Sequence, residues 1–281
     1  MRKTHVCLNS MLLALAFGCV LSITSCTSSA PTSNSGISAK KTALLASVTI
    51  PRAQDLFEPF ILVVQPHTKV TWRNDDTVAH AFATTPDHST FLNPQSFSLN
   101  VEAGQSLQFT FAQPGLYHYY DTAAATWNRV FSRVAARKAA PHFPLAMDGV
   151  IWVQGPISGL PTATLNSILA GHDEYASEFI AVSSPGSISW HNFDEDAHFF
   201  GQVPNWPVPI NPADVGLHRM AGYHDVPGGQ TITILFDTPG LYYYYCRNHD
   251  QIDATTHRAQ ALSKATEYPL PMEGFVLVVG K

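Results

Sequence analysis

A long internal repeat constrains this chain more than any other feature of its sequence. Residues 72–80 match residues 190–198 at an offset of 118, and both segments run from Trp to His. Residues 111–117 match residues 236–242 at an offset of 125, so the second copy carries seven extra residues between these motifs. An internal repeat of this length predicts two tandem domains with the same fold.

Each copy has the residue pattern of a β-sandwich. Apolar and polar side chains alternate over residues 106–111, which is the period of a half-buried strand. The 20 prolines and 17 glycines interrupt short runs rich in Val, Thr, Phe and Tyr. We therefore predict an all-β protein of two tandem Greek-key β-sandwich domains. The expected strands are 60–64, 69–72, 106–111, 116–120 and 150–153 in the first copy, and 231–236, 241–245 and 275–279 in the second.

One segment in each copy breaks the strand pattern. Residues 122–140 and 247–265 are rich in alanine and free of Pro and Gly, a composition that favours helix. We expect a helical insertion before the last strand of each copy. Arg129, Arg133 and Arg137 would then share one helical face, which solvent covers by default. Contact with anionic lipid or with the acidic second copy is the alternative.

The first 26 residues have the pattern of an export signal. Arg2 and Lys3 precede a short apolar core, and the sequence Ile-Thr-Ser-Cys ending at Cys26 resembles a bacterial lipobox. Cys26 is therefore expected to carry lipid, with residues 27–40 as a flexible tether. An ordinary cleaved signal with a coincidental cysteine is the alternative. We expect lipid anchoring in the bacterial cell envelope on the periplasmic side, and Thr27 after the cysteine favours the outer membrane.

Cys246 is the only free thiol that the mature chain would retain after these events. An unpaired thiol in an oxidising compartment is reactive unless something holds it. His249 lies three residues later and His198 lies upstream in the same copy. A thiolate with two imidazoles is a donor set for a soft transition metal. A buried structural cysteine that behaves as a small hydrophobic residue is the plain alternative.

The order His198, Cys246, His249 and Met272 resembles the ligand pattern of the cupredoxins, the plastocyanin- and azurin-like blue-copper family. The resemblance covers most of residues 162–281 and, more weakly, residues 41–155. It implies a copper-binding second domain, residues 156–281, that holds one type 1 copper ion. Its equatorial ligands would be the two histidines and the cysteine, with Met272 as the weak axial ligand.

The spacing before the methionine departs from that pattern. Twenty-two residues separate His249 from Met272, where the family usually has only a few. Gln251, His257 and Glu273 therefore stay open as replacements for the axial ligand. A carboxylate ligand would resemble the red copper protein nitrosocyanin.

The first copy, residues 41–155, lacks two of these donors. Asp121 and Ala124 stand where the second copy has its cysteine and its second histidine, whereas His80 and Met147 remain. A blue-copper site needs the thiolate, so we predict a degenerate domain without copper. A site for a harder metal made of His80, His118 and Asp121 is the alternative.

The implied function is electron transfer by a carrier that is not an enzyme. A two-domain copper oxidase or nitrite reductase would need a histidine beside Cys246, where Tyr245 and Arg247 stand, and the chain has no His-x-His pair. Copper binding or delivery without redox work is a further alternative. Residues 156–281 carry 13 acidic and 5 basic residues, a net charge of −8, which suits a basic redox partner such as a cytochrome or a copper enzyme. The whole-chain charge of −5 argues against nucleic acid, and a homo-oligomer stays open.

Overall fold

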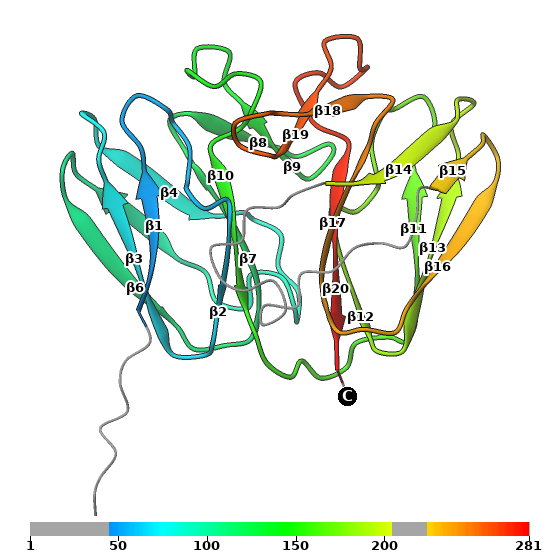
Figure 1. Ribbon diagram of the computed structural model, residues 1–281, viewed down its shortest axis with the longest axis horizontal. Helices are drawn as coiled ribbons and strands as arrows, with labels where there is room; N and C mark the ends of the chain where they lie inside the picture. The colour runs from blue at the N-terminus through cyan, green and yellow to red at the C-terminus, as the bar shows by residue number, and fades with distance from the viewer. Residues whose placement is uncertain (1–44, 204–223, 281) are drawn as a thin grey trace, which may run out of the picture. The chain divides into compact units, whose positions relative to one another are not determined.

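The computed structural model describes residues 45–203 and 224–280, and all of their regular elements are β-strands (Figure 1). Within these two stretches, no helix has the length and hydropathy needed to cross a membrane. The predicted leader, the lipidated Cys26 and the tether lie outside the described residues. The strands of the first copy are β1 (Leu45–Ile50), β2 (Ile61–Val64), β3 (Thr68–Asn74), β4 (His80–Thr84), β5 (Ser98–Val101), β6 (Ser106–Phe111), β7 (Gly115–Asp121), β8 (Ala125–Asn128), β9 (Arg133–Ala136) and β10 (Asp148–Val153). Those of the second copy are β11 (Ala163–Ile168), β12 (Phe179–Ser183), β13 (Gly186–Asn192), β14 (His198–Gln202), β15 (His224–Val226), β16 (Thr231–Phe236), β17 (Gly240–Cys246), β18 (Asp250–Ile252), β19 (Ala259–Ala261) and β20 (Glu273–Val279).

The two copies have the same topology. In the first, a three-stranded sheet β1-β3-β6 is accompanied by a five-stranded sheet β2-β10-β7-β4-β5. In the second, the sheets are β11-β13-β16 and β12-β20-β17-β14-β15. Even the central hydrogen bond repeats, since Trp72 Nε1 donates to Tyr119 Oη and Trp190 Nε1 donates to Tyr244 Oη, both at 3.3 Å. The predicted all-β fold of paired sandwiches is confirmed.

Strands β2, β10 and β20 of the five-stranded sheets are buried on both faces. Every residue of β2, β10 and β20 is buried, because one face packs inside its own sandwich and the other joins a cluster shared by the two copies. In that shared cluster the ring of Phe60 lies 6.2 Å from the ring of Phe275 and 6.1 Å from that of Tyr243. Burial on both faces explains why these strands have continuous apolar runs in the sequence.

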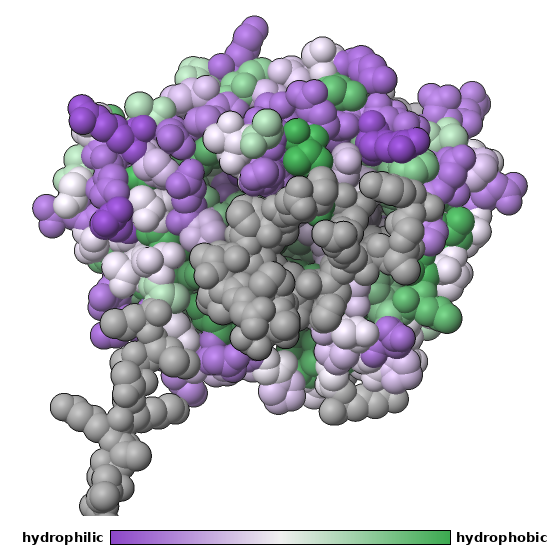
Figure 2. Space-filling view, viewed as in Figure 1, coloured by the Kyte–Doolittle hydropathy of each residue, from purple (hydrophilic) through white to green (hydrophobic). Residues whose placement is uncertain are grey.

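The predicted helical insertions are wrong. Residues 125–136 form the β8–β9 hairpin and residues 250–261 form the β18–β19 hairpin. An Asx turn begins each connection, because the side chain of Asn128 accepts the N–H groups of Val130 and Phe131, and that of Asp253 accepts those of Thr255 and Thr256. This turn chemistry overrides the helical preference of alanine. Figure 2 shows hydrophilic residues gathered over the end of the molecule that carries these hairpins.

The expectation of a solvated arginine face is also wrong for Arg133. Its side chain is only 2% exposed and makes ion pairs with Glu174 and Glu178 of the second copy. Contact with the acidic second copy, the alternative considered from the sequence, is what the fold provides for this residue.

Gly274 is a close-packing position in β20 that generates a stability prediction. A Cβ atom there would lie 2.5 Å from both Cζ and Oη of Tyr244, whose ring is fully buried. We expect Gly274→Ala to lower the free energy of unfolding by roughly 1–3 kcal/mol, because the ring cannot retreat. Urea denaturation measures the change. Gly280→Ala is the control, since its Cβ would lie an ordinary 3.5 Å from Pro239. Equal losses in the two variants would contradict the packing argument.

Candidate metal centre

Cys246 lies at the end of β17, the central strand of the second copy's five-stranded sheet. Alternation along the strand places its side chain on the same face as Tyr242 and Tyr244, inside the sandwich core. The side chain is fully buried, and the backbone N–H of Phe199 donates to its sulfur at 3.3 Å. Among the described residues it is the free cysteine.

His198 faces the sulfur from the neighbouring strand. It opens β14, and its Nδ1 lies 3.8 Å from Cys246 Sγ. Its Nε2 lies 3.0 Å from Asp194 Oδ2, so the ring is held from behind by a carboxylate. The loop before it is fixed by Asn192, whose side-chain amide donates to the carbonyl oxygens of Asp196 and Val226. Because Asp194 occupies Nε2 of His198, Nδ1 is the nitrogen that faces the thiol.

His249 completes the group from the turn after β17. Its N–H donates to the Cys246 carbonyl at 3.1 Å, and its own carbonyl accepts the N–H of Leu262 at the end of the β18–β19 hairpin. Its Nε2 lies 3.1 Å from Asp173 Oδ1, whereas its buried Nδ1 has no hydrogen-bond partner. Both histidines are therefore oriented through Nε2 by a carboxylate, an arrangement common for metal-binding histidines.

The three donor residues lie close enough for one ion. One ligand atom each from His198, Cys246 and His249 lies within 4.8 Å of the other two. Metal–nitrogen and metal–sulfur bonds are about 2.0–2.3 Å long, so a single ion could reach all three atoms. The unpaired Nδ1 of His249 and the nitrogen–sulfur donor set both fit a soft transition-metal ion.

Met272 lies beside this group. Its side chain is 1% exposed and belongs to the same buried cluster as Cys246. Its carbonyl accepts the N–H of Cys246 at 2.9 Å, and its N–H donates to Asp250 Oδ1 at 3.1 Å. The long intervening segment therefore folds as a hairpin and returns the methionine to the cysteine, despite the 22 residues between it and His249.

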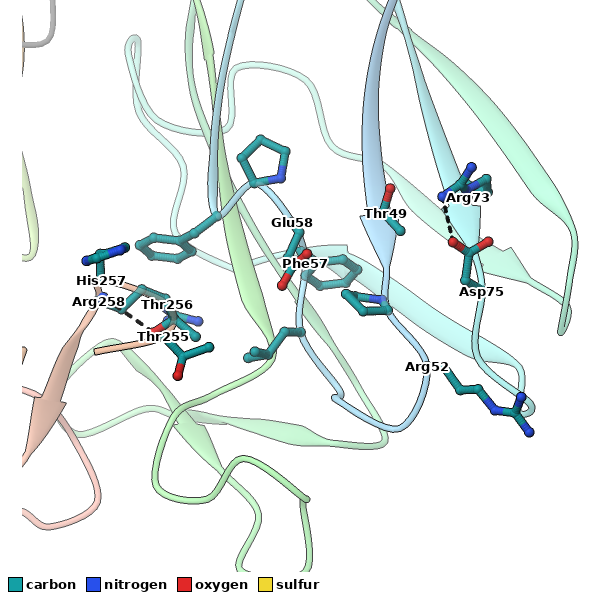
Figure 3. A pocket seen from close by; sticks show the side chains of 14 residues that line it. Thr49, Arg52, Phe57, Glu58, Arg73, Asp75, Thr255, Thr256, His257 and Arg258 are labelled. Carbon is teal, nitrogen blue, oxygen red and sulfur yellow. Dashed lines mark hydrogen bonds and ion pairs between the residues drawn. The ribbon is translucent and has the colours of Figure 1, made fainter. Parts of the chain in front are cut away.

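The alternative axial residues lie elsewhere. Gln251 is exposed and pairs with Gln260 across the β18–β19 hairpin at 2.9 Å. Glu273 is buried and accepts a hydrogen bond from the Tyr243 hydroxyl, and its side chain does not join the cysteine group. His257 lines a cavity of about 850 Å³ between residues 49–60 and the turn at 255–258 (Figure 3). None of His198, Cys246, His249 and Met272 lines that cavity.

Burial shifts the pKa of two of the donors, Cys246 and His249. It raises the pKa of the Cys246 thiol to about 11, although the N–H groups of Phe199 and Asn248 act in the opposite direction. The thiol therefore needs a neighbouring cation to ionise at neutral pH, and a bound metal ion is such a cation. Burial also lowers the pKa of His249, which favours the neutral imidazole that binds metals.

The equivalent position in the first copy holds an ion pair. His80 Nε2 lies 3.4 Å from Asp76, which matches Asp194 at the offset of 118. Its Nδ1, however, lies 3.1 Å from Asp121, the residue that replaces the cysteine. The other oxygen of Asp121 accepts the N–H groups of Ala123 and Ala124. The carboxylate therefore takes over the nitrogen that would otherwise face a thiolate.

The residues considered for a harder metal in the first copy, His80, His118 and Asp121, do not form one group. His118 lies with Asp148, at 2.9 Å, and is separate from the group of Asp55, Asp76 and His80 that the described residues form. Asp55 matches Asp173 at the offset of 118, so both copies repeat a pair of carboxylates beside their first histidine.

The sequence reasoning missed the carboxylates that hold the histidines. A signal was present for Asp194, since an aspartate stands four residues before the histidine in both copies. Asp173 matches Asp55 at the offset of 118, but its contact with His249 joins residues that are distant in the sequence. Tyr175 was missed as well. Its ring contacts those of Phe200 and Tyr244, as Phe57 does in the first copy, but its buried hydroxyl has no partner.

Comparisons with known proteins give likenesses in part of the chain. No family model matches the chain, and no curated protein matches it. A purple cupredoxin from Nitrosopumilus maritimus is 22% identical with a TM-score of 0.27, covering 39% of this chain and 99% of that one. An oxidized amicyanin mutant is 19% identical with a TM-score of 0.27, covering 39% and 81%. A Cu(I) amicyanin mutant is 20% identical with a TM-score of 0.28, covering 39% and 82%. Likenesses of this extent carry no functional inference.

The His80–Asp121 pair generates a pH-dependent prediction. Burial alone would lower the pKa of His80, but hydrogen bonds with Asp121 and Asp76 and the charges of Asp121 and Asp55 raise it above its ordinary value. Ionised His80 therefore stabilises the fold below the unfolded pKa of about 6.5, and this contribution is lost as pH rises through the folded pKa. We expect Asp121→Asn to lower the free energy of unfolding by about 2–4 kcal/mol near pH 5.5 and by less near pH 9.

Urea denaturation at the two pH values measures this difference. Copper content per chain serves as the control, and we expect Asp121→Asn to leave it unchanged. An equal loss of stability at both pH values would contradict the ion-pair account, and a fall in copper content would mean that the first copy also holds metal.

Proposed function

We propose that the second copy binds one copper ion through His198, Cys246, His249 and Met272 and carries single electrons between redox partners. The observation that carries this proposal is that His198, Cys246 and His249 bring one ligand atom each within 4.8 Å of one another, while the buried Nδ1 of His249 has no hydrogen-bond partner. An unpaired buried nitrogen costs free energy unless a ligand satisfies it. A bound copper ion would supply that partner and a reversible one-electron couple.

The side chains around the group support rapid electron transfer. Asp194 and Asp173 hold the two imidazoles from behind, so the donors are oriented before any ion is present. Cys246 and Met272 are almost completely buried, so the surrounding core excludes water. A fixed donor set whose sulfur is shielded from water rearranges little when its charge changes by one, which favours an electron carrier over a catalyst.

The exported lipoprotein setting is part of the same proposal. Lipid at Cys26 would tether the protein at the periplasmic side of the outer membrane. The net charge of −8 over residues 156–281 suits a basic redox partner, such as a cytochrome or a copper enzyme. Copper delivery is the second candidate, and ready loss of Cu(I) to a chelator, without a reversible voltammetric wave, would favour it.

Cys246 gives the most direct test of this proposal. We expect Cys246→Ser to abolish the intense visible absorption of the copper-loaded protein, because that band requires a copper–thiolate bond. Absorption and EPR spectra of the full-length protein provide the measurement. Asp121→Ser is the matched control, because Asp121 occupies the equivalent position in the first copy. Wild-type protein that stays colourless in cupric salts, with a thiol that alkylates freely, would sink the proposal.

Met272 is tested by a conservative change. We expect Met272→Leu to retain copper and the thiolate band while it shifts the midpoint potential and the EPR hyperfine splitting, because a weak ligand is removed and the equatorial donors remain. Met147→Leu is the control, since Met147 is also fully buried and stands at the matching position of the first copy. Identical spectra and potentials for wild type and Met272→Leu would exclude the methionine as a ligand.

A further inference from the structure

The segment 169–178, between β11 and β12, faces the metal centre with two of its residues. Asp173 Oδ1 lies 3.1 Å from His249 Nε2. Tyr175 packs its ring against those of Phe200 and Tyr244 and belongs to the same buried cluster as Cys246. The position of this segment therefore decides how His249 is oriented and how the core beside the cysteine is filled.

Residues 266 and 267 of the second copy hold Asp173 in place through hydrogen bonds. Its Oδ2 accepts the N–H of Thr266 at 2.7 Å, and its own N–H donates to Glu267 at 2.7 Å. Its Oδ1 is left for His249. A carboxylate bound at both oxygens is a rigid acceptor, so a shift of the segment is transmitted to the imidazole.

The same segment is held from its other side by the first copy. Arg133 of β9 donates from Nε to Glu174 Oε2 at 3.0 Å and from Nη2 to the Tyr175 carbonyl at 3.1 Å. Its Nη1 lies 3.3 Å from Glu178 Oε2. The planar guanidinium therefore contacts this segment at Glu174, at the Tyr175 carbonyl and at Glu178. The first two contacts lie next to Asp173 and at Tyr175 itself. These groups are buried, so water does not screen the contacts.

An arginine from each copy contacts the other copy, but the two arginines have different partners. Arg258 stands at the position of Arg133 in the second copy, but it donates to Asp148 Oδ1 at 2.6 Å and to the Ala146 carbonyl at 2.9 Å. Its guanidinium stacks at 3.7 Å on Phe60, which replaces Glu178 at the matching position of the first copy. Leu56 likewise replaces Glu174 there. Of the two matching segments, 51–60 and 169–178, only the second contacts the opposing arginine through acidic side chains.

We propose that Arg133 is a positioning residue for the metal centre of the other copy: it fixes segment 169–178 and thereby holds Asp173 against His249. This inference rests on the proposed function. It gives the first copy a role, because a domain without the cysteine supplies the cation that orders the site in its neighbour.

Lysine substitutions at the two arginines test this role in the full-length protein. Arg133→Lys keeps the charge but loses the planar fork, so it cannot hold Glu174 and the Tyr175 carbonyl together. In metal-free protein we expect amide hydrogen exchange in segment 169–178 to become about tenfold faster. After copper loading we expect a shifted thiolate band, EPR hyperfine splitting and midpoint potential. Arg258→Lys is the matched control, since its hydrogen bonds go to Asp148 and Ala146, and we expect both readouts to stay at wild-type values.

Glu174→Gln is the second variant, for use if Arg133→Lys does not fold. It keeps an acceptor for Arg133 Nε but removes the ion pair, so we expect faster exchange of the segment and spectral shifts in the same direction. Unchanged exchange and unchanged spectra in the folded variants would overturn the role of Arg133. Equal changes in Arg133→Lys and Arg258→Lys would also overturn it, because they would indicate general loosening between the copies.

The metal-free exchange measurement separates this inference from the proposed function. Faster exchange in Arg133→Lys alone, in a protein whose wild type shows no copper–thiolate band, would uphold the role of Arg133 in the segment and reject the copper proposal. A normal copper–thiolate band in the wild type that is unchanged in Arg133→Lys would uphold the copper proposal and reject the role of Arg133.

Discussion

The alternation of side chains along β17 determines most of what surrounds it. Leu241 and Tyr243 point toward the cluster shared with the first copy, whereas Tyr242, Tyr244 and Cys246 point into the core of their own sandwich. One strand therefore supplies both the contact between the copies and the thiol of the candidate centre. A slip of one residue would exchange these two faces, so the register of β17 against β20 is tightly specified.

The two copies show how one scaffold supports different chemistry at one position. Each has a histidine at the start of its fourth strand and an aspartate behind that histidine at Nε2. At Nδ1 the first copy places the carboxylate of Asp121, and the second places the sulfur of Cys246. A carboxylate neutralises an imidazolium within the protein, whereas a protonated thiol cannot. Both ring nitrogens of His80 in the first copy therefore have carboxylate partners, whereas the second copy leaves the buried Nδ1 of His249 without a hydrogen-bond partner.

The strands could be predicted from the sequence because period-two alternation and an internal repeat reinforce each other. The helices expected over 122–140 and 247–265 were wrong because alanine composition was weighed without the turn-forming side chains of Asn128 and Asp253. The cysteine and its two histidines could be proposed as ligands from residue type and order alone. The roles of Asp173 and Arg133 depend on side chains that are distant in the sequence, and only the folded chain brings these together.

The burial of Arg133 also bears on how far this protein can be divided. A fragment limited to residues 156–281 would keep every candidate copper ligand, yet it would leave Glu174 and Glu178 without their cation and expose the apolar outer face of β12 and β20 to water. The autonomous unit is therefore the pair of sandwiches. Domain boundaries drawn from the ligands alone would divide this shared apolar cluster between two fragments.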